Sequence, residues 1–120
     1  MPLELQSLLE SILRRVRRIR EKTDGVSLAT YCDDLDLQDI CERSLIEIGE
    51  STVQIRNSYA EAVAQIRDYP QICGLKNILV HESFGIDHDR IWSVIQQGLD
   101  PLEEDIQRML DESTSMTARS

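Results

Sequence analysis

The sequence has few cysteines and no long apolar segment, and each shortage excludes a class of protein. Cys32, Cys41 and Cys73 are odd in number and lack Cys-x-x-Cys spacing, which disfavours a disulfide framework and a zinc site. We expect them to be reduced and mostly packed. No apolar run approaches the roughly 20 residues that a membrane span needs, and the N-terminal residues do not resemble a signal peptide. The sequence therefore predicts a cytoplasmic protein with no membrane contact.

Positive charge is also scarce. There are 13 Lys and Arg against 22 Asp and Glu, so the formal net charge is −9. This charge repels nucleic acid at long range, and any contact with RNA must use a local basic patch. One basic run stands out, and it consists of Arg14, Arg15, Arg17, Arg18 and Arg20. A run of this kind is usually a solvated helix face, and the alternative is an RNA-binding strip.

Several catalytic motifs are absent. The chain has no Gly-x-x-x-x-Gly-Lys-[Ser/Thr] loop, no Gly-x-Gly-x-x-Gly fingerprint and no Gly-x-Ser-x-Gly elbow, so nucleotide hydrolysis, dinucleotide binding and serine hydrolase chemistry are unsupported. A di-iron bundle needs Glu-x-x-His, but Ile78 and Gly85 stand three residues before the two histidines. The sequence therefore predicts neither a metal site nor a cofactor.

Apolar residues recur every three or four positions almost throughout the chain, which predicts helices. The first helix runs to Asp24-Gly25, and Ser27 begins a short second helix that ends near residue 33. A third helix follows Asp34 or Asp36, and its apolar stripe runs as far as Tyr59. The pattern predicts an all-α, antiparallel bundle of four to five helices, with a single domain over residues 1–112 and a frayed polar tail over 113–120.

The second half continues this pattern. A fourth helix begins after Tyr69-Pro70, and Asp87 caps a fifth. We expect a break near Gly98, after which Asp100 caps a new helix with Pro101 in its first turn.

The fourth helix carries an unusual set of polar side chains, and we expect it to end near Gly85. A cation, an amide, an imidazole and a hydroxyl lie within eight residues of an apolar segment, as Lys76, Asn77, His81 and Ser83. Groups that can bind phosphate and move a proton rarely gather so densely on a segment whose apolar pattern is typical of a protein core. The sequence therefore predicts a functional site here.

The order of several motifs resembles a known family, the HepT-like branch of the HEPN superfamily. The motifs are Glu47-Ile48-Gly49-Glu50, Tyr69-Pro70, the segment 76–87, and Ile91-Trp92 with a later proline. The resemblance implies a small, HEPN-like, all-helical protein, typically a homodimer. It also implies a metal-independent ribonuclease toxin whose partner is a minimal nucleotidyltransferase antitoxin.

The family motif is Arg-x-x-x-x-His-x-Tyr, with Arg and His catalytic and Tyr modified with AMP by the antitoxin. By position, His81 matches the family histidine, Lys76 stands at the arginine and Ser83 at the tyrosine. A lysine offers one hydrated point charge where an arginine holds phosphate with two parallel hydrogen bonds. Ser83 keeps a hydroxyl but is shorter and less acidic than a tyrosine.

RNA carries its own nucleophile, the 2′-OH, so its cleavage needs only an acid or base and a cation. Asn77 precedes His81 by four residues, shares its helix face, and can orient the imidazole or bind a phosphate oxygen. Lys76 precedes His81 by five residues and lies about 140° around an ideal helix from it. A composite cleft, formed where the helix ends near Phe84-Gly85 or where two subunits meet, would solve this geometry. The second possibility is an independent reason to expect a homodimer.

Each candidate residue also has a plain structural interpretation. His81 can simply stabilise the C-terminal end of its helix, and His88 reads as a surface residue. Arg43 and Glu47 are four residues apart and can pair, either as a solvated ion pair or as support for the site.

Two functions therefore remain open. The first is a HepT-like endoribonuclease toxin, attenuated by its lysine, with His81 as acid or base and Lys76 and Asn77 as phosphate ligands. The alternative is a catalytically degenerate helical module that keeps the fold and binds a nucleotidyltransferase. Only the first predicts growth arrest that depends on His81.

Overall fold

The computed structural model describes residues 1–82 and 85–119, with side chains described through residue 114. The described residues form helices and no strand, which confirms the all-α prediction. The helices are α1 (Leu3–Thr23), α2 (Leu28–Asp33), α3 (Leu35–Ser58), α4 (Ala60–Val63), α5 (Tyr69–His81), α6 (His88–Ser93), the π-helical turn η1 (Val94–Gly98) and α7 (Leu99–Arg119). The molecule is elongated, with principal extents of 52 × 29 × 19 Å.

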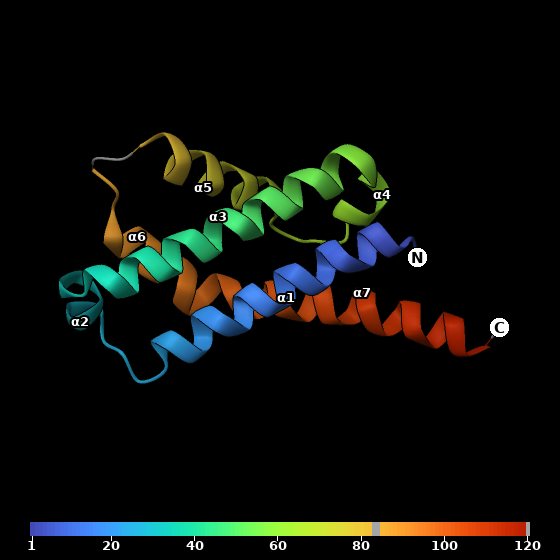
Figure 1. Cartoon of the computed structure of the whole chain (residues 1–120), viewed down its shortest axis with the longest axis horizontal. Coiled ribbons are helices and arrows are strands. Elements are labelled where there is room, and N and C mark those ends of the chain that lie inside the picture. Colours follow the sequence, from blue (N-terminus) through green and yellow to red (C-terminus); the bar gives the residue numbers. More distant parts are fainter. Residues whose placement is uncertain (83–84, 120) are drawn as a thin grey trace.

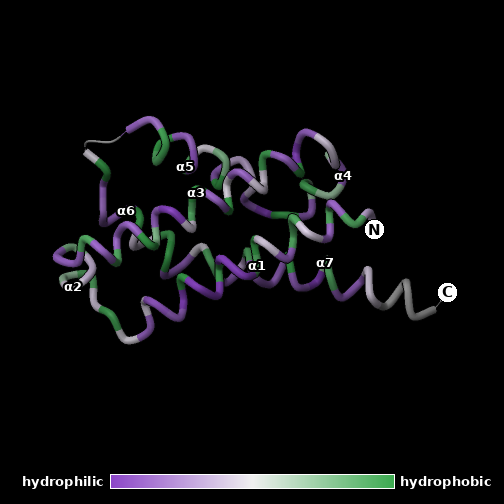
Figure 2. The backbone as a smooth tube through the Cα atoms, viewed as in Figure 1, coloured by the Kyte–Doolittle hydropathy of each residue, from purple (hydrophilic) through white to green (hydrophobic). Residues whose placement is uncertain are grey.

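The long helices run alternately up and down, with α3 between α1 and α5 and with α7 packed against α1 (Figure 1). Every long helix has hydrophobic stretches that alternate with hydrophilic ones (Figure 2), as an amphipathic period requires. The apolar positions meet in one core. Its fully buried members include Leu9, Ile12, Val16, Ile19, Ile48, Ile55, Ile66, Ile91, Leu99 and Ile106.

Most of the predicted helix boundaries are confirmed. Gly25 follows α1 with a positive φ of 72°, a conformation that glycine adopts without strain. The side chains of Ser27, Asp34 and Asp87 each accept a backbone hydrogen bond in the first turn of α2, α3 and α6. Caps of this kind typically stabilise a helix by about 1 kcal/mol.

Besides the end of α5, three boundaries differ from the prediction. Tyr59 does not continue the third helix but follows its end, and the short α4, which the sequence pattern did not reveal, comes next. The predicted restart at Asp100 is wrong, because α7 continues directly from η1, and the Asp100 carboxylate forms an ion pair with Arg20 of α1. The wider turn of η1 precedes Pro101, whose ring would clash with the preceding turn of a regular α-helix. At its far end α7 extends to Arg119, through the predicted polar tail.

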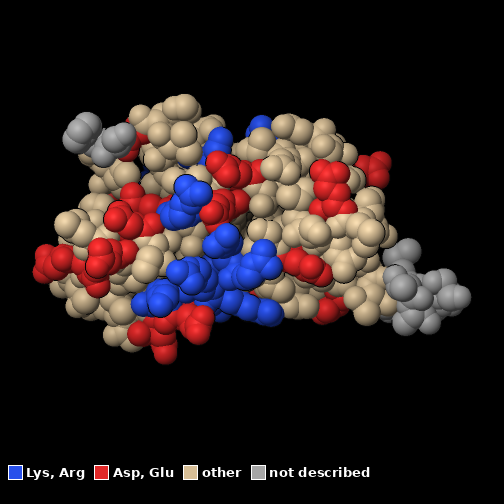
Figure 3. All heavy atoms as spheres, viewed as in Figure 1, with Lys and Arg blue, Asp and Glu red and all other residues tan. Residues whose placement is uncertain are grey.

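Charge is unevenly spread over the surface. Figure 3 shows acidic side chains scattered over one face of the molecule, while basic side chains gather in a group over α1. No helix in the described part of the chain is both long and apolar enough to cross a membrane.

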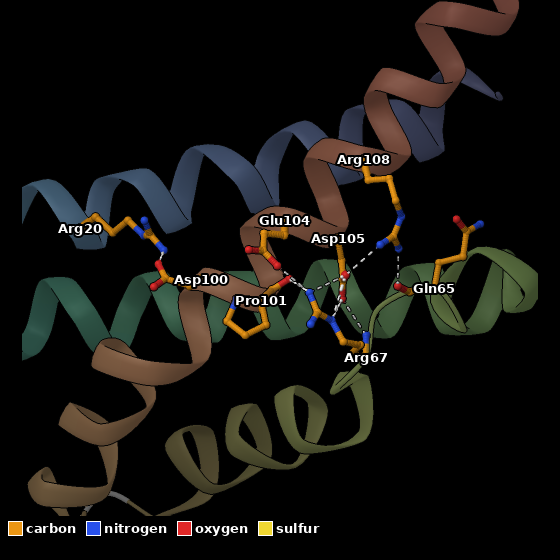
Figure 4. A network of polar contacts seen from close by, with 8 residues as sticks. All are labelled: Arg20, Gln65, Arg67, Asp100, Pro101, Glu104, Asp105 and Arg108. Carbon is orange, nitrogen blue, oxygen red and sulfur yellow. Dashed lines mark hydrogen bonds and ion pairs between the residues drawn. The ribbon is translucent and has the colours of Figure 1, made fainter.

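One polar network fastens the segment between α4 and α5 to α7 (Figure 4). Asp105 is only 1% exposed, and its carboxylate accepts hydrogen bonds from the backbone and the guanidinium of Arg67 at 3.0 to 3.2 Å. Arg108 donates both to Asp105 and to the carbonyl of Gln65. Burial by itself would raise the pKa of Asp105, but the hydrogen bonds from Arg67 and the charge of Arg108 hold that pKa below its usual range. The network fixes the start of α5 relative to the core.

Candidate functional site

Helix α5 is positioned by a close approach to α3 at Gly49. A Cβ atom built on Gly49 would lie 2.2 Å from the Cβ atom of Lys76 and 2.7 Å from its Cγ atom. Real side chains never come this close, so the approach depends on the missing side chain. The stem of Lys76 therefore lies over Gly49, and the Gly49 within the predicted Glu-Ile-Gly-Glu motif is the residue that sets this contact.

The predicted end of the fourth helix is wrong, because α5 ends at His81 and not near Gly85. The backbone N–H of Glu82 still bonds to the carbonyl of Ile78, but Glu82 has already left the helical conformation. Gly85 instead has a φ of +80° in the connection that leads to Asp87 and α6. His81 thus occupies the last helical position, where its imidazole is exposed.

The motif side chains point in different directions from α5. Lys76 is half-buried on the side that faces α3, whereas Asn77 and His81 are exposed. Because α3 and α5 are antiparallel, His81 lies about 7.5 Å farther along α5 than Lys76 and lies level with the part of α3 near Arg43. Within residues 1–82 and 85–119, no hydrogen bond or ion pair engages the side chains of Lys76, Asn77 or His81. These three polar groups are therefore available to a ligand.

The predicted pair on α3 is present and has an additional member. The Nε atom of Arg43 lies 3.0 Å from an Oε atom of Glu47, and the second Oε atom of Glu47 forms an ion pair with Arg15 of α1. Glu47 therefore links α3 to α1, an interaction that the spacing within α3 could not reveal. Arg43 is 75% exposed and uses only its Nε atom in the described contacts, so its outer nitrogens face solvent.

Ser83, the residue at the position of the family tyrosine, lies outside the described residues. The structure therefore gives no geometry for a hydroxyl at this position.

A separate cleft of about 460 Å³ lies on another side of α5, between α3 and η1. Its lining includes the apolar side chains of Leu45, Ile48 and Leu75, and Arg90 contributes a cation. None of Lys76, Asn77 and His81 lines it. The cleft and the motif therefore use different faces of the same helix.

The second histidine is not the surface residue that the sequence predicted. His88 is half-buried, and its ring meets the edge of the Tyr31 ring at a centroid distance of 6.1 Å. The difference arises because α2 and α6 pack together, which local sequence could not reveal. Burial raises the pKa of Tyr31, and it also raises the pKa of Cys41 to about 11. Tyr31, Cys41 and His88 therefore belong to the contact between α2, α3 and α6 and not to the motif on α5.

The described residues contain no group of three or more His, Cys, Asp and Glu side chains placed to hold a metal ion. The side chains of the site offer one imidazole, one ammonium and one amide.

Comparison with known proteins gives a consistent result. A protein of Caldanaerobacter subterraneus subsp. tengcongensis named "Putative RNase" is 28% identical over 85% of this chain and 90% of its own length. A protein of Methanocaldococcus jannaschii with the same descriptive name is 23% identical over 87% of this chain and 94% of its own length. No solved structure matches the chain. Residues 12–109 match the family described as Ribonuclease HepT-like, and the chain therefore belongs to that family.

Proposed function

We propose that this protein is an attenuated, metal-independent endoribonuclease whose acid or base is His81 and whose phosphate ligands are Lys76 and Asn77. One observation carries the proposal. In a chain of the HepT-like ribonuclease family, two positions of the catalytic motif hold Lys76 and His81, and neither side chain, nor that of the neighbouring Asn77, has a described intramolecular partner. Buried polar groups that stabilise a fold are normally paired, as Asp105 is, whereas the exposed side chains of Asn77 and His81 are open to a ligand from solvent.

The reaction needs no group beyond those of the site and the RNA. A neutral imidazole on His81 takes the proton of the ribose 2′-OH, and the 2′-oxygen attacks the adjacent phosphorus. The bond from phosphorus to the 5′-oxygen breaks, the 5′-oxygen takes the proton from the His81 imidazolium, and a 2′,3′-cyclic phosphate remains, so that the imidazole is neutral again. Lys76 and Asn77 stabilise the negative charge that develops on the phosphoryl oxygens. An imidazole suits this step because its ordinary pKa is near neutrality.

The activity is attenuated in this proposal because of Lys76. An ammonium offers a single point of contact, while a guanidinium would hold two phosphate oxygens at once. The half-buried stem of Lys76, packed over Gly49, also limits where its ammonium can reach.

The proposal includes a homodimer with the site at its interface. Lys76 is on the α3 side of α5, and His81 is exposed about 140° farther around the helix, so one subunit does not focus both groups on one phosphate. Val80 is 44% exposed beside them and Ile78 is half-buried, which leaves apolar area for a partner subunit to cover. Leu79, between these two residues, is 7% exposed and belongs to the protomer's own core.

The biological role in this proposal is that of a cytoplasmic toxin neutralised by a nucleotidyltransferase antitoxin. Because Ser83 stands at the tyrosine position, we expect neutralisation mainly by binding, without transfer of AMP to Ser83. Intact mass and peptide mapping after incubation with the partner and ATP would test this. An AMP adduct on Ser83 would contradict it.

The proposed function is tested by comparing the wild-type protein with His81→Ala. Both variants are incubated with RNA in EDTA after separation from contaminating nucleases, and both are induced in cells. We expect RNA cleavage and growth arrest from the wild-type protein alone. His81 is exposed, so thermal unfolding of the variant should match that of the wild-type protein. Equal behaviour of the two proteins would contradict the enzyme and favour a binding module.

A further inference from the structure

The group of basic side chains on α1 is the strongest unexplained feature of the surface. It includes three arginines, Arg14, Arg17 and Arg18, whose side chains line a shallow groove over that helix. We call these three residues the basic strip. All three are exposed, and Arg14 and Arg18 are four residues apart and therefore lie one turn apart on one face.

The basic strip is not neutralised by carboxylates, although acidic residues are abundant in this chain. The neighbouring arginines do pair, Arg15 with Glu47 and Arg20 with Asp100. Within the described part of the chain, Arg14 and Arg18 form no ion pair, and Arg17 donates only to the neutral side chain of Gln107. Three exposed guanidinium groups that form no described ion pair are therefore concentrated at one place on a protein whose net charge is −9.

Further cations lie between the basic strip and the helix that carries the candidate site. Figure 3 shows the basic group over α1 together with separate basic side chains over α3 and toward α5. Arg43 of α3, joined to α1 through Glu47 and Arg15, provides an intermediate cation whose outer nitrogens are exposed. A strand held on α1 can therefore cross α3 on its way to α5.

We propose that the basic strip of α1 binds the sugar–phosphate backbone of single-stranded RNA and feeds it across α3 to His81. The inference rests on the proposed function, because it assigns a place to the substrate of that enzyme. Guanidinium groups suit phosphate because they form parallel, charge-assisted hydrogen bonds. The groove is lined by arginine, glutamate and leucine and has no aromatic side chain on which a base could stack, so the strip holds RNA without reading its sequence.

The overall negative charge does not oppose this assignment at short range. At physiological ionic strength the field of distant carboxylates is screened beyond about 8 Å, and phosphates at the strip meet mainly the local guanidinium groups. Glu10 and Glu21 also line the groove, and they lie before and after the strip along α1 and limit its length.

Binding is measured with a fluorescently labelled, single-stranded 20-nucleotide RNA in the His81→Ala background, so that no cleavage interferes. Arg14→Gln/Arg18→Gln is compared with Arg56→Gln/Arg90→Gln, which removes the same charge from exposed arginines outside the strip. We expect about a tenfold loss of affinity in the strip variant and little change in the control. The slope of log affinity against log salt should also fall by about 1.4 for the two lost phosphate contacts.

Equal losses in the two double variants would overturn the proposal, because binding would then follow net charge alone. Tighter binding of polyglutamate than of RNA by the wild-type protein would also overturn it, because the strip would then fit an acidic polypeptide.

Cleavage assays separate this proposal from the proposed function. The axes of α1 and α5 are about 16 to 20 Å apart across α3, so a dinucleotide at His81 cannot reach the strip. With His81 intact, the strip variant should cleave a dinucleotide at the wild-type rate and should show a raised KM for the 20-nucleotide RNA. Loss of RNA affinity without cleavage in any variant would contradict the enzyme while supporting the strip. Cleavage of the 20-nucleotide RNA that depends on His81 but is unchanged in the strip variant would support the enzyme and contradict the strip.

Discussion

Two polar regions of this molecule use similar chemical groups in opposite ways. Around Asp105, a buried carboxylate and two arginines satisfy one another and tie α7 to the segment before α5. On α5 itself, Lys76 and His81 have no described polar partner, and His81 is exposed while Lys76 is half-buried. The first region holds the fold together, and the second is available to a ligand.

The contrast separates stability from activity. A buried polar group without partners would cost roughly 1 to 3 kcal/mol, so the pairing of Asp105 stabilises the folded chain. An exposed group has no such requirement, because water satisfies it. Substitutions in the first region should therefore change unfolding, and substitutions in the second should change RNA cleavage.

The largest expected effect is that of His81→Gln, which keeps polarity but cannot accept a proton near neutral pH. We expect RNA cleavage to fall by about 100-fold or more, the usual contribution of a general acid or base. The free energy of unfolding should stay within about 0.5 kcal/mol of the wild-type value. Cleavage rates in EDTA and denaturant titrations provide the two measurements. A large loss of stability would show that His81, like Asp105, helps to hold the fold together.

Asp105→Asn should show the opposite pattern. The amide cannot accept hydrogen bonds from Arg67 and Arg108 with both of its terminal atoms, so we expect about 2 to 3 kcal/mol of destabilisation in urea titrations. Glu104→Gln is the matched control, because Glu104 pairs with Arg67 at an exposed position. This substitution should lower the free energy of unfolding by less than about 1 kcal/mol. Similar losses of stability in the two variants would contradict the structural role assigned to the buried carboxylate.

The same carboxylate predicts a pH dependence. Because the pKa of Asp105 in the folded protein is lowered, its contribution is fully present above the unfolded pKa of about 3.9 and is lost as the pH falls through the folded value. The difference in stability between the wild-type protein and Asp105→Asn should therefore be constant near neutral pH and shrink below about pH 4. Urea titrations at several pH values would measure it. A difference that grows on acidification would contradict this assignment.

Gly49→Ala tests the contact that positions Lys76. The added Cβ atom would overlap the stem of Lys76, so α5 must move away from α3, at a net cost of about 1 to 2 kcal/mol and with reduced cleavage. Gly74→Ala is the control, because a Cβ atom on Gly74 of α5 meets nothing within 4 Å. This second change should be neutral or slightly stabilising through helix propensity. Denaturant titration and cleavage rates would distinguish the two glycines.

The smallest expected effect is that of Lys76→Arg. A guanidinium at this position can hold two phosphate oxygens, and we expect cleavage to rise roughly threefold. His81→Ala should abolish cleavage in both the wild-type and the Lys76→Arg background. Unchanged or lower activity in Lys76→Arg would show that residue 76 does not contact the scissile phosphate.

Local sequence was enough to predict most of the fold. The helical period and the caps at Ser27, Asp34 and Asp87 depend on residues within a few positions of one another, and all three caps are present. The pair of Arg43 with Glu47 was predictable for the same reason, since four residues make one helical turn. The motif on α5 was visible as a density of polar groups on an apolar segment.

Only the tertiary structure decided how these pieces combine. The contact of Lys76 with Gly49, the ion pair of Arg15 with Glu47 and the burial of Asp105 all join residues far apart in the sequence. No local pattern encodes such distances. The helix that continues through Pro101 also depends on tertiary packing. The sequence predicted that Asp100 would cap a new helix, but Asp100 instead pairs with Arg20 on α1. The sequence determined which polar groups this protein has for chemistry. Packing between helices decided which of these groups are paired and which remain free to bind a substrate. Only packing removes water from the buried groups, which must then find protein partners, and leaves water around the exposed ones.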